Sequence, residues 1–240
     1  MKLNKLMALL AAFCLAQTAI AYDMADAEKH YAQGDYSTAI IHVKNQLIHT
    51  PKHSKARHLL GVIYLKTGKT SAAEKELGRA WKFEQDNAKY RLDYAQSLLY
   101  NQKYDKVTDL LEVEIDDPAL EGDKLFLLAS LYLVKQQIEQ AEEYFQQAIK
   151  KGNIKAAISL ADIALQKNEL QQARTLIDTV LSTEPDNTSA WKIKALIASA
   201  AQQYQQALEI YTRLIQQNNN DLRLYLQRAS VLMSMTGHLS

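Results

Sequence analysis

Residues 54–87 read SKARHLLGVIYLKTGKTSAAEKELGRAWKFEQDN, and this stretch decides the fold. Its two halves each carry apolar residues at helical spacing, with a small residue, Gly61 or Ala73, in each half. Two packed helices approach closely only where a small residue faces the partner helix. The stretch therefore predicts a hairpin of two helices.

The same pattern recurs along the chain. The small residue of the first helix recurs at spacings of 34, 34, 34, 32, 34 and 34 residues. The small or β-branched residue of the second helix keeps the same spacings. One such residue per helix, in constant register, indicates a hairpin that is repeated along the chain. The first series is Ala27, Gly61, Ala95, Ala129, Ala161, Ala195 and Ala229, and the second is Ala39, Ala73, Val107, Ala141, Ala173 and Ala207.

This pattern resembles the tetratricopeptide repeat, a helix hairpin of 34 residues. The resemblance implies an all-α, right-handed superhelical solenoid of six hairpins plus one further helix. The low content of glycine and proline, 7 and 3 in 240 residues, is consistent with an almost wholly helical chain. The signature positions in residues 54–87 are held by Leu60, Gly61, Tyr64, Gly68, Ala73, Leu77 and Ala80. The copies are predicted to start near Ile20, Ser54, Ala88, Gly122, Ile154 and Thr188, with the further helix from Leu222.

The first 21 residues are predicted to be a secretory signal peptide. Two lysines precede an apolar run from Leu6 to Ala16, and small residues then lead to a cleavage site after Ala21. The mature chain would begin at Tyr22, so residues 22–240 form the predicted solenoid domain, in the periplasm. An uncleaved membrane anchor is the alternative. Lipidation at Cys14 is not expected, because Phe13 stands where a lipoprotein signal has a small residue.

Charge and motifs exclude several classes of function. Without Lys2 and Lys5 the mature chain has 26 basic and 27 acidic residues, a net charge near −1 that argues against nucleic acid. The sequence has no Gly-rich phosphate loop, HExxH helix, CxxC pair or GxSxG turn. We therefore expect neither an enzyme nor a cofactor, and membrane association only through partners.

Two charged segments are candidates for binding sites. The decapeptide HTPKHSKARH holds three histidines, but Pro51 breaks their helical register and no carboxylate lies nearby, so metal binding is not expected. Its lysines and arginine leave open an anionic partner such as an acidic glycan. The segment LEVEIDDPALEGD lacks the spacing of a calcium loop, and Asp116 and Asp117 are interpreted as turn and helix-start residues. Tyr64, Tyr132 and Trp191 are interpreted as packing residues.

A closer resemblance covers about residues 30–110. The runs GDYSTAIIHVKNQL, ARHLLGVIYLKTGKTSAAEKELGRA and QSLLYNQKYDKV are similar to the start of the repeat lipoproteins that accompany exosortase (PEP-CTERM) systems in Gram-negative bacteria. This resemblance implies a periplasmic scaffold that binds partner proteins or peptides in exopolysaccharide export or exosortase-linked protein sorting. A glycan-binding accessory protein and a general cell-envelope assembly adaptor are the alternatives.

The repeat family also implies a binding groove. In that family the fifth and twelfth positions of each first helix line a concave surface. The apolar centre would suit an amphipathic helix or an extended apolar peptide, with basic margins at His58 and Lys192. The alternative is that these residues only pack neighbouring first helices together. The apolar residues at these positions are Leu65, Leu92, Leu99, Phe126, Leu133, Ile158 and Leu165.

Overall fold

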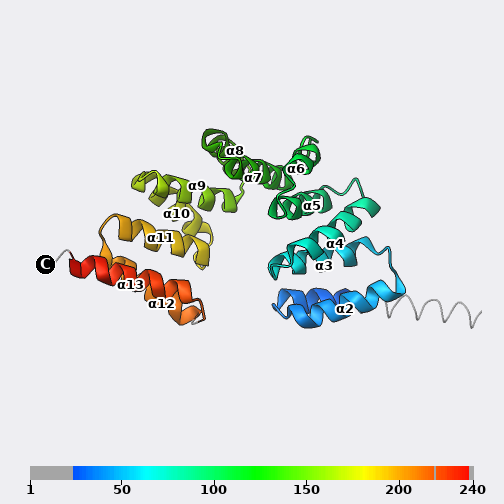
Figure 1. Ribbon diagram of the computed structural model, residues 1–240, viewed down its shortest axis with the longest axis horizontal. Coiled ribbons are helices and arrows are strands. Elements are labelled where there is room, and N and C mark those ends of the chain that lie inside the picture. Colours follow the sequence, from blue (N-terminus) through cyan, green and yellow to red (C-terminus); the bar gives the residue numbers. More distant parts are fainter. Residues whose placement is uncertain (1–23, 219, 238–240) are drawn as a thin grey trace, which may run out of the picture. The chain divides into compact units, whose positions relative to one another are not determined.

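The computed structural model describes residues 24–218 and 220–237 of the chain (Figure 1). Every regular element in this part is a helix, which confirms the predicted all-α fold. The predicted signal peptide and its cleavage site between Ala21 and Tyr22 lie outside the described residues. No described helix combines the length and the apolar character needed to span a bilayer.

The helices alternate as first and second members of hairpins. Residues 24–32 are helical and precede α2, so they form the first helix of the first hairpin. The other first helices are α3 (Ser54–Lys66), α5 (Ala88–Tyr100), α7 (Pro118–Val134), α9 (Ile154–Gln166), α11 (Thr188–Ala200) and α13 (Leu222–Gly237). The second helices are α2 (Tyr36–His49), α4 (Thr70–Phe83), α6 (Tyr104–Leu111), α8 (Ile138–Lys150), α10 (Leu170–Thr183) and α12 (Tyr204–Gln217).

The hairpins are grouped in two compact units. Unit 1 is Met1–Ile115, and unit 2 is Asp116–Ser240. In each unit consecutive helices pack side by side, from α2 to α6 in unit 1 and from α7 to α13 in unit 2 (Figure 1). The boundary follows α6, which is the shortest described helix in the two units, with 8 residues.

The acidic segment at this boundary ends in a helix start at Asp117, as the sequence predicted for this residue. The Asp117 side chain accepts hydrogen bonds from the backbone N–H groups of Ala119, at 2.8 Å, and Leu120, at 3.2 Å. Pro118 takes the first helical position, where its missing N–H costs nothing. Helix α7 therefore begins at Pro118, four residues before the copy start that the 34-residue spacing placed at Gly122.

The series of small residues lies in the core between paired helices. Ala95, Ala129, Ala161 and Ala195 are fully buried, and so is Ala27. A Cβ atom built on Gly61 would lie only 2.5 Å from Cγ of Leu77 on the facing helix α4. This close approach explains why the position is small in every copy. Ala229 on α13 differs, since it is exposed.

The turn within each hairpin contains one residue with left-handed backbone. The values of φ range from 59° to 77°, and four of the six residues are not glycine. Because the left-handed region ends a helix and reverses the chain, one such residue per copy fixes the hairpin geometry. These residues are Gly34, Gly68, Gln102, Gln136, Asn168 and Gln202, and their spacing of 34, 34, 34, 32 and 34 repeats the period of the sequence.

Candidate functional site

Unit 2 contains an open hollow where the starts of its first helices meet. The hollow has a volume of about 360 Å³, and its walls come from the beginnings of α7 and α9 and the residues that precede α9 and α11. Its lining includes the side chains of Asp123, Asn153, Lys155, Ile158, Glu184 and Asn187.

Helix caps form the polar rim of this hollow. The side-chain oxygen of Asn153 accepts from the backbone N–H of Ala156 at 3.0 Å, and its nitrogen donates to Asp123 at 2.9 Å. This single amide therefore caps the start of α9 and ties it to α7. Since an amide nitrogen carries two hydrogens, the bond to Asp123 leaves it a second donor.

The next copy repeats this arrangement. The Asn187 oxygen accepts from the backbone N–H of Ala190 at 2.9 Å, and its nitrogen donates to Glu184 at 2.7 Å. Each asparagine satisfies a backbone donor that the first turn of a helix leaves without an intrahelical partner. The rim is thus held in place by the same bonds that start the helices.

The floor of the hollow is apolar. Ile158 is half-buried and packs on the core cluster that contains Ala157 and Ala161 of its own helix. Lys155 lies one turn before Ile158 and is exposed at the edge. An apolar floor with a few fixed polar groups around it is the usual composition of a site that holds one side chain of a ligand.

The predicted groove residues differ in how well a partner could reach them. Leu92 is 2% exposed, so the prediction that it meets a partner is wrong for this side chain. It packs into the core because α5 is covered on this side by neighbouring helices. Of the other six apolar residues, only Ile158 lines the hollow. All six are half-buried, namely Leu65, Leu99, Phe126, Leu133, Ile158 and Leu165.

Core packing accounts for much of the burial of these side chains. Phe126 and Leu133 contact the cluster between α7, α8 and α9, and the rings of Phe126 and Phe145 lie 5.8 Å apart. Leu165 contacts the adjoining cluster between α9, α10 and α11. The structure therefore gives support to the packing alternative at these positions. Tyr64, Tyr132 and Trp191 also pack against core clusters, as the sequence predicted.

His58, one predicted basic margin, is engaged by the following first helix. His58 Nε2 lies 2.6 Å from Asp93 Oδ2, and the His58 ring stacks on Tyr90 at 4.4 Å. Lys89 also pairs with Asp93, at 3.1 Å. Burial alone would raise the pKa of Asp93, but the hydrogen bond from His58 and the positive charges of Lys89 and His58 outweigh it and lower that pKa.

Lys192, the other predicted margin, is paired in the same way. Its Nζ lies 2.8 Å from Oδ2 of Asp221, just before α13. This hydrogen bond is the main reason that the pKa of Asp221 is lowered. The partner carboxylates lie 35 and 29 residues after His58 and Lys192. Both predicted margins thus already contact a carboxylate, and for Lys192 this ion pair reduces the charge that a partner would meet.

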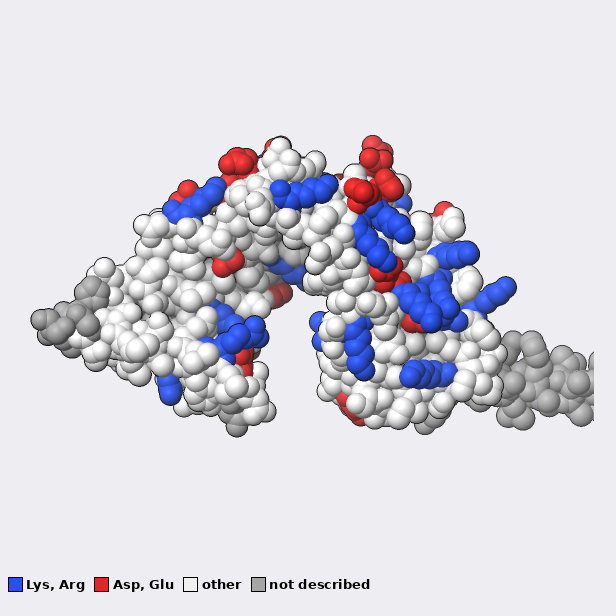
Figure 2. Space-filling view, in the orientation of Figure 1, with Lys and Arg blue, Asp and Glu red and all other residues white. Residues whose placement is uncertain are grey.

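The basic decapeptide of unit 1 also makes hydrogen bonds and ion pairs with other residues of the same unit. His53 Nδ1 accepts from the backbone N–H of Ala56 and caps α3. Lys55 pairs with Glu28 at 2.5 Å, and Arg57 pairs with Glu76 at 2.5 Å. Across the described ranges, no group of three or more His, Cys, Asp or Glu side chains is arranged to hold a metal ion. Figure 2 shows acidic side chains among the basic ones in both units.

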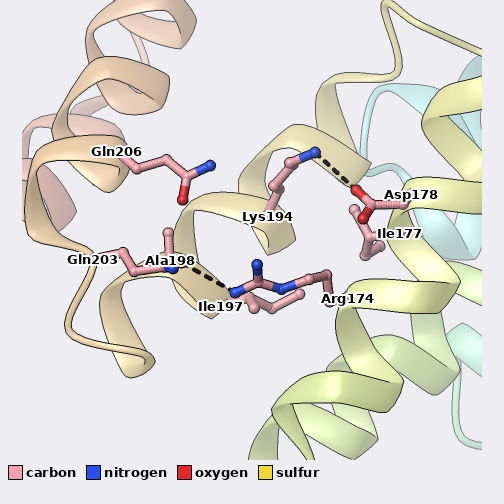
Figure 3. Close-up of a pocket in the computed structure, with 8 residues that line it drawn as sticks. All are labelled: Arg174, Ile177, Asp178, Lys194, Ile197, Ala198, Gln203 and Gln206. Carbon is pink, nitrogen blue, oxygen red and sulfur yellow. Dashed lines mark hydrogen bonds and ion pairs between the residues drawn. The ribbon is translucent and has the colours of Figure 1, made fainter.

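A second, smaller hollow of about 90 Å³ lies between α10, α11 and α12 (Figure 3). Two side-chain bridges cross it. Arg174 donates to Gln203 at 3.0 Å, and Lys194 pairs with Asp178 at 2.8 Å. Because these side chains already satisfy one another, we interpret the feature as a brace between consecutive helices.

The rim of the larger hollow was missed in the sequence. Asn87, Asn153 and Asn187 each stand one residue before a first helix, and each caps it. Asparagine is a favoured capping residue, so its recurrence at this register was the available signal. The hydrogen bond from Asn153 to Asp123 of the preceding copy could not be predicted from the position of the asparagine alone.

Comparison with known proteins now gives the family. The family model described as "Tetratricopeptide repeat" matches residues 30–99 and 132–197, which is more than half of the chain. The chain belongs to the tetratricopeptide repeat family. Its repeats therefore form a scaffold of the kind that binds proteins or peptides, and this fold is generally not catalytic.

One curated relative and several solved structures are similar to the chain. "DnaJ homolog subfamily C member 3" of Gallus gallus is 27% identical over 234 residues. The match covers 86% of the chain but 45% of that relative, so the chain spans less than half of its length.

The solved structures are similar in fold at low identity. Pseudomonas aeruginosa pilF has a TM-score of 0.62 at 17% identity, over 89% of this chain and 98% of that one. PilW, described as a widely conserved type IV pilus biogenesis factor, has a TM-score of 0.67 at 17% identity and the same coverage. The Cut9–Hcn1 structure has a TM-score of 0.71 at 12% identity, over 89% of this chain and 43% of that one. At these identities the likeness establishes the fold alone.

Proposed function

We propose that this protein is a periplasmic scaffold that holds a peptide segment of a partner protein on the first-helix face of its repeats. The observation that carries this proposal is the hollow of unit 2, with Ile158 as its floor and capped helix starts as its rim. It offers a place for one apolar side chain beside fixed hydrogen-bonding groups.

The chemistry of the rim favours an extended peptide. The second amide hydrogens of Asn153 and Asn187 and the exposed ammonium of Lys155 are donors that match main-chain carbonyl oxygens. Asp123 and Glu184 supply acceptors for main-chain N–H groups. A peptide whose apolar side chain rests on Ile158 would place its own backbone among these groups.

The proposed process is exopolysaccharide export or exosortase-linked protein sorting. Support comes from the secretory pattern of residues 1–21 and from the likeness of residues 30–110 to repeat proteins of exosortase systems. A general envelope-assembly adaptor is the alternative within the same class. Direct glycan binding is disfavoured at this site, because none of the residues that line the hollow is aromatic.

The test is crosslinking in intact cell envelopes followed by purification of the protein. Wild type, Lys155→Glu and Lys150→Glu are compared, since Lys150 is also exposed, on α8, but does not line the hollow. We expect a partner protein with wild type and with Lys150→Glu, and a several-fold loss of it with Lys155→Glu. Recovery of sugar without protein, or unchanged capture by Lys155→Glu, would overturn the proposal.

A further inference from the structure

The smaller hollow of unit 2, between α10, α11 and α12, has a positively charged lining. Its charged side chains are Arg174, Asp178 and Lys194, and its polar neutral ones are Gln203 and Gln206. Two cations and one carboxylate leave one net positive charge. Figure 3 shows these side chains reaching the hollow from all three helices or, for Gln203, from the residue before α12. We call this feature the bridged hollow.

An earlier copy of the repeat has a balanced ion pair where this lining has its first bridge. Three copies before Arg174 and Gln203, the corresponding residues are Glu74 and Lys103. Lys103 Nζ lies 2.6 Å from Glu74 Oε1, so the two charges cancel. In unit 2 the same two positions hold a cation and a neutral amide, which are still hydrogen-bonded, at 3.0 Å. The bridge keeps its place in the repeat but carries a net positive charge.

Lys194 occupies a position where other copies have a core leucine. Leu60 and Leu160 also stand directly before the small residue of their first helix, and they are 4% and 3% exposed. Lys194 instead keeps its ammonium group at the hollow, 2.8 Å from Asp178 Oδ1 and 5.4 Å from the centre of the Trp191 ring. The indole ring attracts the cation and holds it in place. Because lysine is rarely a core residue, packing does not explain its presence here.

The two bridges use only part of the hydrogen-bonding capacity of their cations. A guanidinium group has five N–H donors and an ammonium group has three. One terminal nitrogen of Arg174 donates to Gln203. Figure 3 shows its other terminal nitrogen pointing away from Gln203, toward the space between Lys194 and Gln206. The Gln206 amide adds two further N–H donors. Three side chains from three helices therefore present donors to one small space.

We propose that the bridged hollow binds one carboxylate group of a partner molecule. The planar guanidinium of Arg174 matches the geometry of a carboxylate, and Lys194 and Gln206 can donate to the same group. A monoanion balances the single net charge, whereas the second charge of a dianion such as sulfate would meet Asp178. The volume is about 90 Å³, and one water takes about 30 Å³ of the liquid, so a group of about three heavy atoms fits.

The bridged hollow is a separate site from the larger hollow of unit 2. None of the residues that line one of them lines the other. Since ion pairs that water can reach contribute little by themselves, a lone carboxylate should bind weakly. The bridged hollow would then serve as one contact within a larger partner surface. The carboxylate can come from an acidic side chain or from the end of a chain, because both present the same group.

The first test is a titration of the predicted mature chain with sodium acetate, with chloride replaced at constant ionic strength. The NMR signal of the backbone amide of Ala198, which lines the hollow, reports binding. We expect a saturable shift in wild type, and binding weaker by about tenfold or more in Lys194→Leu and in Arg174→Gln. Lys194→Leu restores the leucine of other copies, so it should fold, and circular dichroism checks this for both variants.

The matched control is Arg213→Met. Arg213 also lies over the Trp191 ring, at 4.6 Å, but it does not line the hollow. This variant removes the same charge and should bind acetate as wild type does. An unsaturable shift in wild type, an equal loss in Arg213→Met and Arg174→Gln, or tighter binding of sulfate than of acetate would overturn the proposal.

The second test distinguishes the two sources of the carboxylate with three N-acetylated tripeptides of glycine. One has a central glutamate and an amidated end, one has only glycine and a free carboxylate end, and one has a central glutamine and an amidated end. Saturable binding of the first assigns the hollow to an acidic side chain, and saturable binding of the second assigns it to the end of a chain. Equal binding of the third peptide, or binding of none of them, would contradict recognition of a carboxylate.

Discussion

Gly61→Ala tests the close packing of the first and second helices most sharply. The added Cβ would lie 2.5 Å from Cγ of Leu77, 2.8 Å from its Cδ2 and 3.1 Å from its backbone nitrogen. Leu77 is fully buried, and Cγ is the branch point of its side chain, so a small rotation cannot relieve the contact. The two helices α3 and α4 must move apart instead.

Two opposing effects set the magnitude. Replacing a helical glycine by alanine favours the helix by about 1 kcal/mol, whereas overpacking a core costs about 1–3 kcal/mol. We therefore expect Gly61→Ala to lower the free energy of unfolding by up to about 2 kcal/mol. Gly78→Ala is the matched control. Its Cβ would meet only the far end of the Tyr94 ring, at 2.9 Å, and this half-buried ring can shift.

The assay is urea unfolding followed by the fluorescence of Trp81, which lies on α4, in a Trp191→Phe background. Gly78→Ala should leave stability unchanged or raise it by up to about 1 kcal/mol, because it has the same helical preference without the clash. Adding Leu77→Ala to Gly61→Ala should show a favourable coupling of about 1 kcal/mol or more, since the clash disappears. If Gly61→Ala stabilises unit 1 as much as Gly78→Ala does, the close approach of α3 and α4 is wrong.

Three further predictions address packing, electrostatics and export. Ala129→Leu should lower stability by about 1–3 kcal/mol because Ala129 is fully buried, whereas Ala229→Leu should change it much less, and equal melting shifts would contradict the assigned register. The lowered pKa of Asp93 means that its ionised form stabilises the fold at pH values above about 4, its ordinary range, and that this contribution is lost as the pH falls through the lowered pKa. Asp93→Asn should therefore flatten the acid limb of the stability profile of unit 1, and an unchanged limb would show that the pairing with His58 and Lys89 is unimportant. Mass analysis of the exported protein should find Tyr22 at its N-terminus, and an intact Met1 or an acylated Cys14 would refute the predicted export signal.

The repeat architecture could be predicted from the sequence because it depends on local periodicity. One small residue per helix and one turn per copy set the register, and the left-handed residues from Gly34 to Gln202 follow that register in the structure. The pattern needs no knowledge of contacts between distant residues, since each hairpin packs mainly on its neighbours in the chain.

The candidate site was harder to predict because it depends on contacts between copies. His58 and Lys192 are basic residues in the sequence, but in the structure each is engaged by a carboxylate that lies in or just before the next first helix. Leu92 occupies the same position as Ile158, yet it is buried whereas Ile158 lines a hollow. Helix α7 shows a further difference. It begins at Pro118, capped by Asp117, and not at Gly122, where the 34-residue spacing predicts the start. Such differences depend on contacts between neighbouring side chains, which the repeat pattern alone does not predict.

We propose above that the first-helix face of unit 2 holds a partner protein. Its most direct test places a photo-crosslinking amino acid at Lys155, beside the hollow, and separately at Thr179, which is exposed on the second helix α10. After irradiation of living cells, we expect a covalent adduct with a specific protein from position 155 and none from position 179. Adducts of equal yield from both positions, or from position 179 alone, would contradict it.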